Sequence, residues 1–296
     1  MSMNAGTIEQ ELPYGGGGIV QPNPDPRNYE WSKLGLGSRL TPNDHSAVPE
    51  FNIMNQGVSS ACGGYAAAYY KYAIEHRQIN NTRNFSPYAT YGYRVEDAYE
   101  GEGMYTKDIC KGLQKNGVPF FQPSDNGEYT YEEAKQLATK PRPEYAEEAL
   151  LFANESYYYC NTWTEIMQAI KETGGCLILV PIYLNMYGTD PYINQYEGEF
   201  TGIYHFLCAV DYSDDFKYVK CVNGWGDYND THGYVYLSTE LEFEEAVAFV
   251  DTTVEEELKA FDFTDIDETR WSYDYVQTCA RSHIMEGFDD KSFQPE

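Results

Sequence analysis

Residues 55–66, with the sequence NQGVSSACGGYA, place one cysteine directly before a run of residues with helical spacing. One face of the predicted helix carries Tyr65, Tyr69, Tyr72 and His76. Ser59 and Ser60 are favourable N-cap residues, so we expect Cys62 in the first helical turn. Backbone N–H groups and the helix dipole lower the pKa of a thiol there. The position suits a nucleophile, although a lone cysteine in such a setting is more often a core residue.

Three polar residues elsewhere in the chain accompany Cys62. Gln56 lies shortly before it, and its side-chain amide could donate a hydrogen bond to an oxyanion formed beside the cysteine. His205 and Asn223 follow later in the chain, in GIYHFLCAVDY and VKCVNGWG. An imidazole can activate a thiol, and an amide can orient the imidazole. Cysteine, histidine and asparagine occur in this order in the papain-like hydrolases.

Whole segments of the chain resemble the papain-like cysteine peptidases, in their bacterial or phage form. NQGVSSACGGYA resembles the family pattern QGxCGSCWAF, and GIYHFLCAVDY resembles xxHAVxxVGY. YVKCVNGWGDYNDTHGYVYLS resembles WxxKNSWGxxWGxxGYxxx, and GEGMYTKDICKGLQKNGVPF resembles the segment that walls the substrate cleft. Singly, these residues have structural explanations as a core histidine or a turn asparagine. Together and in order, across roughly residues 49 to 240, they make the resemblance specific.

The resemblance implies a role for each residue of the candidate active site. Cys62 would be the nucleophile, His205 the general base and acid, and Asn223 the group that orients the imidazole. Gln56 would form the oxyanion hole with the backbone N–H of Cys62. Trp225 would shield the hydrogen bond between Asn223 and His205 from water. A thiolate beside an imidazolium needs no separate deprotonation step before acylation.

The candidate substrate-binding residues are Gly103, Met104 and Tyr105. They match the edge along which the family holds an extended peptide as an added strand, with Met104 or Tyr105 lining an apolar pocket. A plain glycine turn is the alternative interpretation of this stretch.

The sequence departs from the family pattern at three positions. Gly63 replaces the tryptophan after the nucleophile, which leaves the shape of the substrate site in doubt. Ser59 replaces a half-cystine, which fits a bacterial or reducing-compartment member. Gly224 replaces the serine of the NSW motif, a small change.

The composition excludes several classes of partner. The 296 residues carry a formal net charge of -27, which argues against nucleic acid and anionic membrane surfaces. No stretch is long and apolar enough for a membrane span. Seven cysteines without a C-x-x-C motif indicate neither a disulfide framework nor a zinc site. His205 and Cys208 lie three apart on an expected strand and should face opposite sides, so we predict no metal site and no cofactor.

The order of predicted elements, helices first and strands later, indicates an α+β fold with two packed lobes. The resemblance implies the papain-like form of this fold, with a helical left lobe, a β-barrel-like right lobe and the active site in the cleft between them. We expect a Gly/Pro-rich arm at 1–48, a papain-like domain at 49–250, and a linker helix with a further module at 251–296. Helices are predicted at 107–115, 164–172 and 240–260, and strands at 176–183, 205–212, 218–222 and 233–237. The arm could cross the cleft and be trimmed by the enzyme itself.

The final segment, FDFTDIDETRWSYDYVQTCARSHIMEGFDDKSFQPE, resembles the first part of an S-layer homology motif. The resemblance implies a cell-surface protein tethered to secondary cell-wall polymer. No signal peptide is recognisable, so a phage-associated or cytoplasmic protein stays open.

We therefore predict a cysteine endopeptidase that acts on extended polypeptides, with cell-surface or envelope proteins as the natural targets. One alternative is an inactive papain-like binding or structural protein, which Gly63 favours. The other is a peptidoglycan amidase or transglutaminase-like relative.

Overall fold

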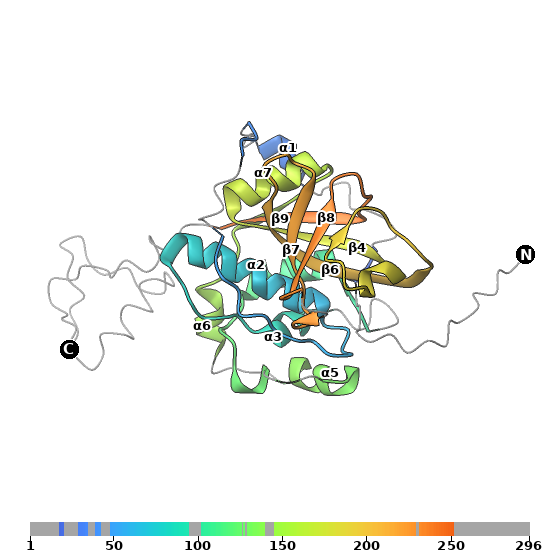
Figure 1. The fold of residues 1–296 in the computed structure, drawn as a ribbon. Coiled ribbons are helices and arrows are strands. Elements are labelled where there is room, and N and C mark those ends of the chain that lie inside the picture. Colours follow the sequence, from blue (N-terminus) through green and yellow to red (C-terminus); the bar gives the residue numbers. More distant parts are fainter. Residues whose placement is uncertain are drawn as a thin grey trace, which may run out of the picture. The chain divides into compact units, whose positions relative to one another are not determined.

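A computed structural model describes most of the chain up to residue 251 (Figure 1). The chain divides into two compact units, Met1–Asp251 and Thr252–Glu296. The second unit, with the predicted linker helix and S-layer homology segment, lies outside the described residues. These are residues 18–20, 29–34, 39–42, 48–94, 102–125, 127, 129–139, 145–228 and 231–251.

Most helices precede the long strands in the described chain, as the sequence predicted. The expected helices at 107–115 and 164–172 are confirmed as α4 and α7, and the helix that follows the nucleophile segment is α2. Within the described residues no helix has the length and apolar character needed to span a membrane. The helices are α1 (Trp31–Leu34), α2 (Cys62–Ile79), α3 (Pro87–Tyr91), α4 (Thr106–Asn116), α5 (Tyr131–Thr139), α6 (Ala146–Leu150) and α7 (Trp163–Thr173).

The strands form one mixed sheet with the order β3-β9-β4-β6-β7-β8-β5, to which β1 and β2 add a short parallel pair beside β6. The predicted strands at 176–183 and 218–222 are confirmed as β4 and β7, and β6 begins five residues before its predicted start. The strands are β1 (Gly18–Ile19), β2 (Met104–Tyr105), β3 (Ser156–Tyr159), β4 (Cys176–Tyr183), β5 (Tyr192–Ile193), β6 (Phe200–Tyr212), β7 (Tyr218–Val222), β8 (Tyr234–Ser238) and β9 (Glu245–Val250).

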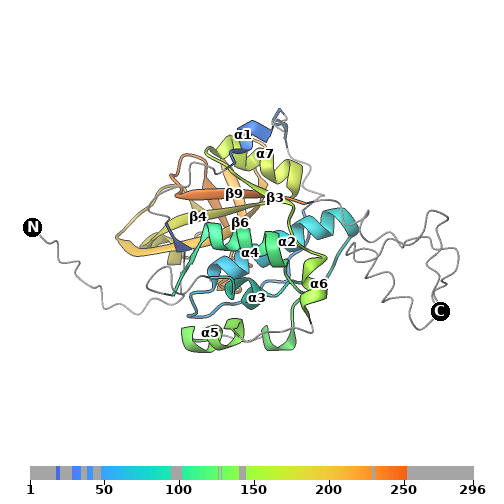
Figure 2. The same cartoon turned by 180° about the vertical axis from the view of Figure 1, so that it is seen from behind.

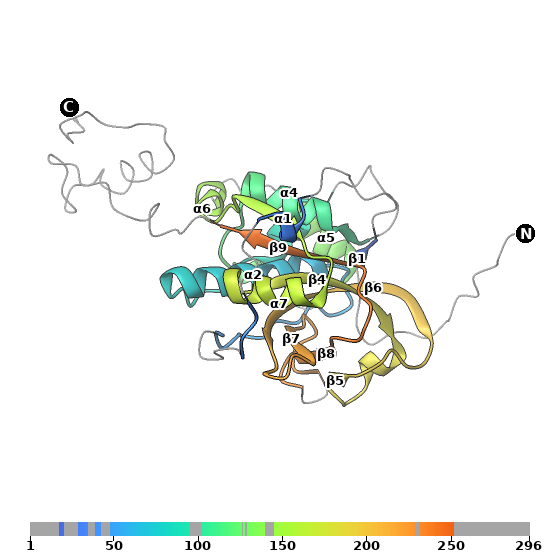
Figure 3. The same ribbon diagram turned by 90° about the horizontal axis from the view of Figure 1, so that it is seen from above.

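Side-chain alternation along the strands divides the core in two. In β4, Leu177 and Leu179 join the core that contains α2, whereas Ile178 and Val180 join the core that contains α7. Helices α2 and α7 accordingly lie on opposite faces of the sheet: Figure 1 shows α7 above the strands and α2 below them, and in the view from above the two helices overlap (Figure 3). The view from behind shows α4 and α6 on the α2 side (Figure 2). Helix α2 is therefore covered by the sheet on one side and by helices on the other.

One predicted element is wrong. Residues 245–250, EAVAFV, form strand β9 and not part of a helix from 240 to 260. β9 pairs antiparallel with both β3 and β4, and its residues 246–249 are buried. Acidic residues around it imitate a helical pattern, but apolar residues suited to a strand between two others decide the structure.

A buried ion cluster connects α2 to the end of β9. Lys71 and Glu75 are fully buried, with Lys71 Nζ 2.8 Å from Glu75 Oε1. Lys71 also pairs with Asp251, the last described residue, whose side chain is 4% exposed. Burial raises the pKa of the Glu75 carboxyl, while Lys71 opposes this effect. The cluster fixes the point at which the chain leaves the first unit.

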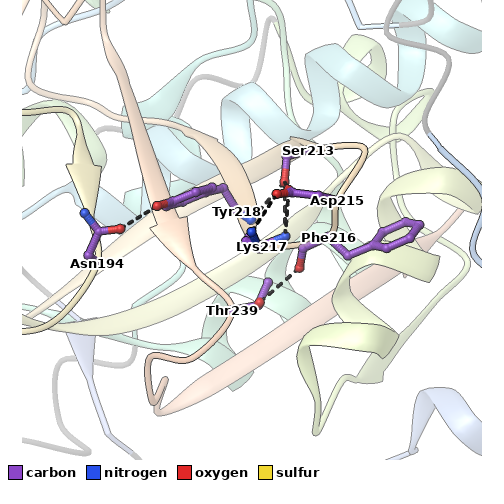
Figure 4. A network of polar contacts seen from close by, with 7 residues as sticks. All are labelled: Asn194, Ser213, Asp215, Phe216, Lys217, Tyr218 and Thr239. Carbon is purple, nitrogen blue, oxygen red and sulfur yellow. Dashed lines mark hydrogen bonds and ion pairs between the residues drawn. The ribbon is translucent and has the colours of Figure 1, made fainter.

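A polar network closes the turn between β6 and β7 (Figure 4). The Ser213 hydroxyl donates to Asp215 at 2.7 Å, and the Lys217 N–H donates back to Ser213 Oγ at 3.1 Å. Thr239, just after β8, donates to the Phe216 carbonyl at 3.0 Å. These bonds hold the β6–β7 hairpin against β8, and so fix the register of two strands that lead to candidate site residues.

Gly63 and Gly64 provide a matched test of how α2 packs. A Cβ on Gly64 would lie 2.1 Å from the Pro87 carbonyl oxygen, a backbone atom that cannot rotate away. We expect Gly64→Ala to lower the free energy of unfolding by about 3 kcal/mol. In Gly63→Ala the new Cβ meets side chains, the nearest being Ile109 Cδ1 at 2.8 Å, so the loss should be clearly smaller. Both variants gain similar helix propensity. Equal midpoints of urea unfolding would contradict this account.

Candidate active site

Cys62 is the first residue of α2 and is 1% exposed. Its placement in the first helical turn is confirmed, but Ser59 and Ser60 do not cap the helix. The N-cap residue is Ala61, and no side chain caps the helix there. Ser59 Oγ donates instead to the Gln56 carbonyl at 2.7 Å, inside the loop before the helix. The serines are used to shape this loop, which leaves the N-terminal end of α2 without a side-chain cap.

His205, Asn223 and Trp225 come together at the sheet. His205 lies in β6 and is fully buried, and its Nε2 is 2.9 Å from Oδ1 of Asn223, which follows β7. The Trp225 ring stacks on the His205 ring, with centroids 4.6 Å apart. Because a carbonyl oxygen only accepts, Nε2 carries the proton in this bond. Nδ1 of the neutral ring is then the basic nitrogen, and it is buried without a hydrogen-bond partner among the described residues.

Burial controls the protonation of His205. Desolvation lowers the pKa of the imidazole from 6.5 to about 4, and the hydrogen bond to Asn223 opposes this lowering in part.

His205 and Cys208 face opposite sides of the sheet. Cys208 belongs to the core on the α2 side, whereas Trp225, against which His205 stacks, belongs to the other core. In the described part of the chain, no group of three or more His, Cys, Asp or Glu side chains is arranged to hold a metal ion.

Gln56 lies beside the segment that contains Asn223. Its backbone N–H donates to the Gly224 carbonyl at 2.7 Å, and the preceding Asn55 forms an antiparallel bridge with Trp225. The Gln56 side chain is fully buried, and its Nε2 donates to the Ser59 carbonyl at 2.8 Å. A Cβ on Gly224 would lie 3.0 Å from Gln56 Oε1, so the glycine allows this close packing.

The first turn of α2 packs against β6 next to His205. The place of a side chain at Gly63 is occupied by Ile109, Phe206 and Met104, all within 3.4 Å of where its Cβ would lie. Phe206 directly follows His205, just as Gly63 directly follows Cys62. The structure therefore brings the Cys62 segment and the His205 segment into packing contact, and the space of the missing tryptophan is filled by neighbours.

The predicted substrate-binding residues lie at a strand edge. Gly103 and Met104 are buried and Tyr105 is partly exposed. Met104 and Tyr105 form β2, which pairs in parallel with β1 of the N-terminal arm. Gly18 in β1 pairs at the same time with Tyr204, the residue before His205. The edge expected to hold an extended peptide thus holds a piece of the arm.

Three residues that join the segments of the site, Tyr65, Ser60 and Glu102, were not among the predicted site residues. The Tyr65 hydroxyl lies 3.1 Å from both the Asn55 carbonyl and the Tyr88 hydroxyl, and so ties α2 and α3 to the Gln56 loop. Ser60 Oγ donates to the Glu102 carboxylate at 2.8 Å, which joins the Cys62 loop to the segment before β2. The sequence signal for Tyr65 was its place on the buried face of the predicted helix. Ser60 and Glu102 were each within segments that the resemblance covers.

Solved structures similar to this chain are cysteine proteases. Xylellain, a cysteine protease from Xylella fastidiosa, superposes with a TM-score of 0.66 at 16% identity, over 83% of this chain and 100% of that chain. The chain has the papain-like fold. A cysteine protease from Carica candamarcensis gives 0.51 at 15% identity (77% and 100% covered), and a procathepsin B from Trypanosoma congolense gives 0.52 at 11% (78% and 79%). The predicted fold class is therefore confirmed.

The sequence comparisons concern the other end of the chain. Residues 262–296 match the family model of the S-layer homology domain, which confirms the resemblance seen in the sequence. No curated protein matches the sequence.

The buried imidazole of His205 predicts that the stability of the protein depends on pH. This dependence is best measured in Cys62→Ala, in which residue 62 cannot ionise. The folded-state pKa of about 4 lies below the unfolded value of about 6.5, so the unfolded chain binds the proton first as the pH falls. The contribution of the neutral His205 imidazole to the free energy of unfolding is fully present above pH 6.5 and is lost as the pH falls towards 4. At about 1.4 kcal/mol per pKa unit, Cys62→Ala should lose up to roughly 3 kcal/mol that Cys62→Ala/His205→Gln does not lose. Parallel unfolding curves from pH 7 to 4 would refute this.

Proposed function

We propose that this protein is a cysteine endopeptidase that hydrolyses peptide bonds in extended polypeptides. One observation carries the proposal: the proton on His205 Nε2 is donated to Asn223 beneath Trp225, which leaves Nδ1 as a buried base. A core histidine would be expected to have both ring nitrogens satisfied. The papain-like fold and the packing of the first turn of α2 against β6 support the same assignment.

The proposed reaction assigns one task to each residue. His205 Nδ1 takes the proton of the Cys62 thiol, and the thiolate attacks the carbonyl carbon of the substrate. Gln56 Nε2 and the backbone N–H of Cys62 stabilise the resulting oxyanion. The imidazolium then gives its proton to the leaving amine, and a thioester remains on Cys62. Water activated by His205 hydrolyses this thioester and regenerates the thiol.

The burial of His205 makes the two ionisations interdependent. An isolated imidazolium is disfavoured at this position, as the lowered pKa of His205 indicates. A thiolate on Cys62 would supply the opposite charge and stabilise the imidazolium, because opposite charges strengthen each other in a site of low polarity. We infer that the thiol and the imidazole exchange one proton as a pair.

We further propose that the enzyme works at a cell surface. The S-layer homology match at residues 262–296 supports attachment to cell-wall polymer, and surface or envelope proteins would then be the accessible substrates. The bacterial or phage form of the enzyme is the interpretation carried over from the sequence.

Two alternatives make different predictions. An inactive binding protein would tolerate loss of the base at His205 Nδ1 without loss of function. A peptidoglycan amidase or transglutaminase-like enzyme would keep the reactive thiol but would not cleave polypeptides. A digest of purified peptidoglycan beside a denatured protein substrate separates the second alternative from the proposal.

The first test is intact-mass labelling with an epoxysuccinyl peptide near neutral pH. We expect a single adduct on the wild-type chain, none on Cys62→Ala, and labelling slowed by about 100-fold or more on His205→Ala, because general-base activation contributes about 10²- to 10⁴-fold. Cys110→Ala is the control, since Cys110 is a buried thiol in α4 that has no part in the proposed reaction. Equal labelling of wild type and His205→Ala would mean that the imidazole does not activate Cys62.

We also propose that the arm restrains the enzyme. A polypeptide bound along β2 and beside Tyr204 would have to displace β1, which occupies both edges. A Cβ on Gly18 would lie 2.1 Å from Leu179 Cδ1 and 3.2 Å from the Tyr204 carbonyl carbon, so a large side chain at this position would push β1 away from these neighbours.

Gly18→Leu should therefore expel the arm and raise the labelling rate of Cys62 about tenfold or more, the factor that corresponds to 1.4 kcal/mol of lost arm binding. The intact mass after incubation shows in addition whether the arm is trimmed. An unchanged rate in Gly18→Leu would refute the restraint, and an unchanged N-terminus in both wild type and Cys62→Ala would refute self-trimming.

A further inference from the structure

The strand β1 shows where a side chain of a bound polypeptide would point. The Cβ position of Gly18 is directed at Leu179 and at the Tyr204 side chain, whose Cβ is 3.3 Å away. A bound peptide that replaces β1 beside Tyr204 would place a side chain against Leu179 and Tyr204. The residues around Leu179 and Tyr204 therefore determine which side chain is accepted.

Glu245 lies next to Leu179 in the sheet. Glu245 in β9 is the direct antiparallel partner of Leu179 in β4, so the two side chains share the face of the sheet that also carries Phe206. The Thr106 hydroxyl at the start of α4 donates to the Glu245 carboxylate. Glu245 is partly exposed, and the hydrogen bond from Thr106 orients its carboxylate.

Aromatic rings continue from Tyr204 along β6, to the end of β4 and into the connection between these two strands. Tyr204 contacts Phe200, Phe200 contacts Tyr183, and the Tyr183 and Tyr196 rings stack at 4.8 Å with only 12° between their planes. All four rings are partly exposed. The Glu244 backbone N–H donates to the Leu179 carbonyl at 2.9 Å, which brings a second, exposed acidic residue next to Leu179.

The strand-rich half of the chain is strongly acidic. From residue 172 to residue 251 the only lysine or arginine side chains are Lys217 and Lys220, whereas acidic side chains outnumber them several-fold. Lys217 is paired with Asp215 at 3.3 Å, and Lys220 lies over the Tyr234 ring at 4.0 Å. The charge complement of this surface is a cation, and tyrosine faces with nearby carboxylates bind lysine or arginine well.

We propose that Glu244, Glu245, Tyr183 and Tyr204, here named the tyrosine–glutamate site, bind a lysine or arginine side chain of the polypeptide substrate close to the cut. The inference rests on the proposed peptidase function and adds the substrate class: basic polypeptides. The rings hold the aliphatic part and the face of the cation, and the two carboxylates receive its hydrogen bonds.

The test compares two epoxysuccinyl dipeptide probes that differ in one residue, lysine against norleucine, which has the same chain length without the charge. Second-order labelling rates of Cys62 are measured on the full chain. We expect the lysine probe to react about tenfold faster, a ratio that corresponds to 1.4 kcal/mol. The ratio should fall towards one in Glu244→Gln/Glu245→Gln and in high salt. Glu240→Gln, an exposed position just before these residues, is the matched control and should keep the ratio.

Each outcome is decisive. A ratio near one on the wild-type chain, or a high ratio that survives in Glu244→Gln/Glu245→Gln, would overturn the tyrosine–glutamate site while the proposed peptidase stands. Labelling by neither probe, on wild type and on Gly18→Leu alike, would instead overturn the peptidase function, and the substrate class with it.

Discussion

Helix α2 can bring Cys62 to the sheet only because its first turn has no side chains at positions 63 and 64. Gly64 lets the helix touch the backbone of α3 at Pro87, and Gly63 lets it touch Phe206 of β6. A helix pressed from both sides has no freedom to shift its start. The position of the thiol is therefore set by backbone contact, and the remaining candidate residues are arranged around this fixed point.

The second part of the site depends on the alternation of side chains between the two faces of the sheet. His205 and Phe206 are neighbours in β6 but face opposite cores, so one strand provides both the candidate base and the surface on which α2 rests. The hairpin to β7 then returns the chain to Asn223, and Gly224 and Trp225 pair with the Gln56 loop. Three separate segments of the sequence meet at one place because backbone hydrogen bonds join them pairwise.

The sequence was most informative where local pattern and tertiary structure agree. The helix after Cys62 and strands β4 and β7 could be predicted because their apolar spacing matches their burial. Strand β9 could not, because acidic neighbours imitate a helix and its two partner strands lie far away in the sequence. The serines before Cys62 were assigned as caps on propensity alone, whereas the loop uses Ser59 to bind Gln56. The pairing of Gly18 with two distant strands has no local signal beyond glycine itself.

The buried cluster of Lys71, Glu75 and Asp251 has a mechanical consequence. Tension applied to the chain beyond residue 251 would reach the first unit at Asp251, which is paired with Lys71 in the helix that begins with Cys62. Behind it, β9 is bonded to a strand on each side, so a pull along β9 would shear two ladders of hydrogen bonds at once and could not unzip them one by one. A protein held to a surface through its C-terminal end would thus bear load through a strand that is bonded on both sides.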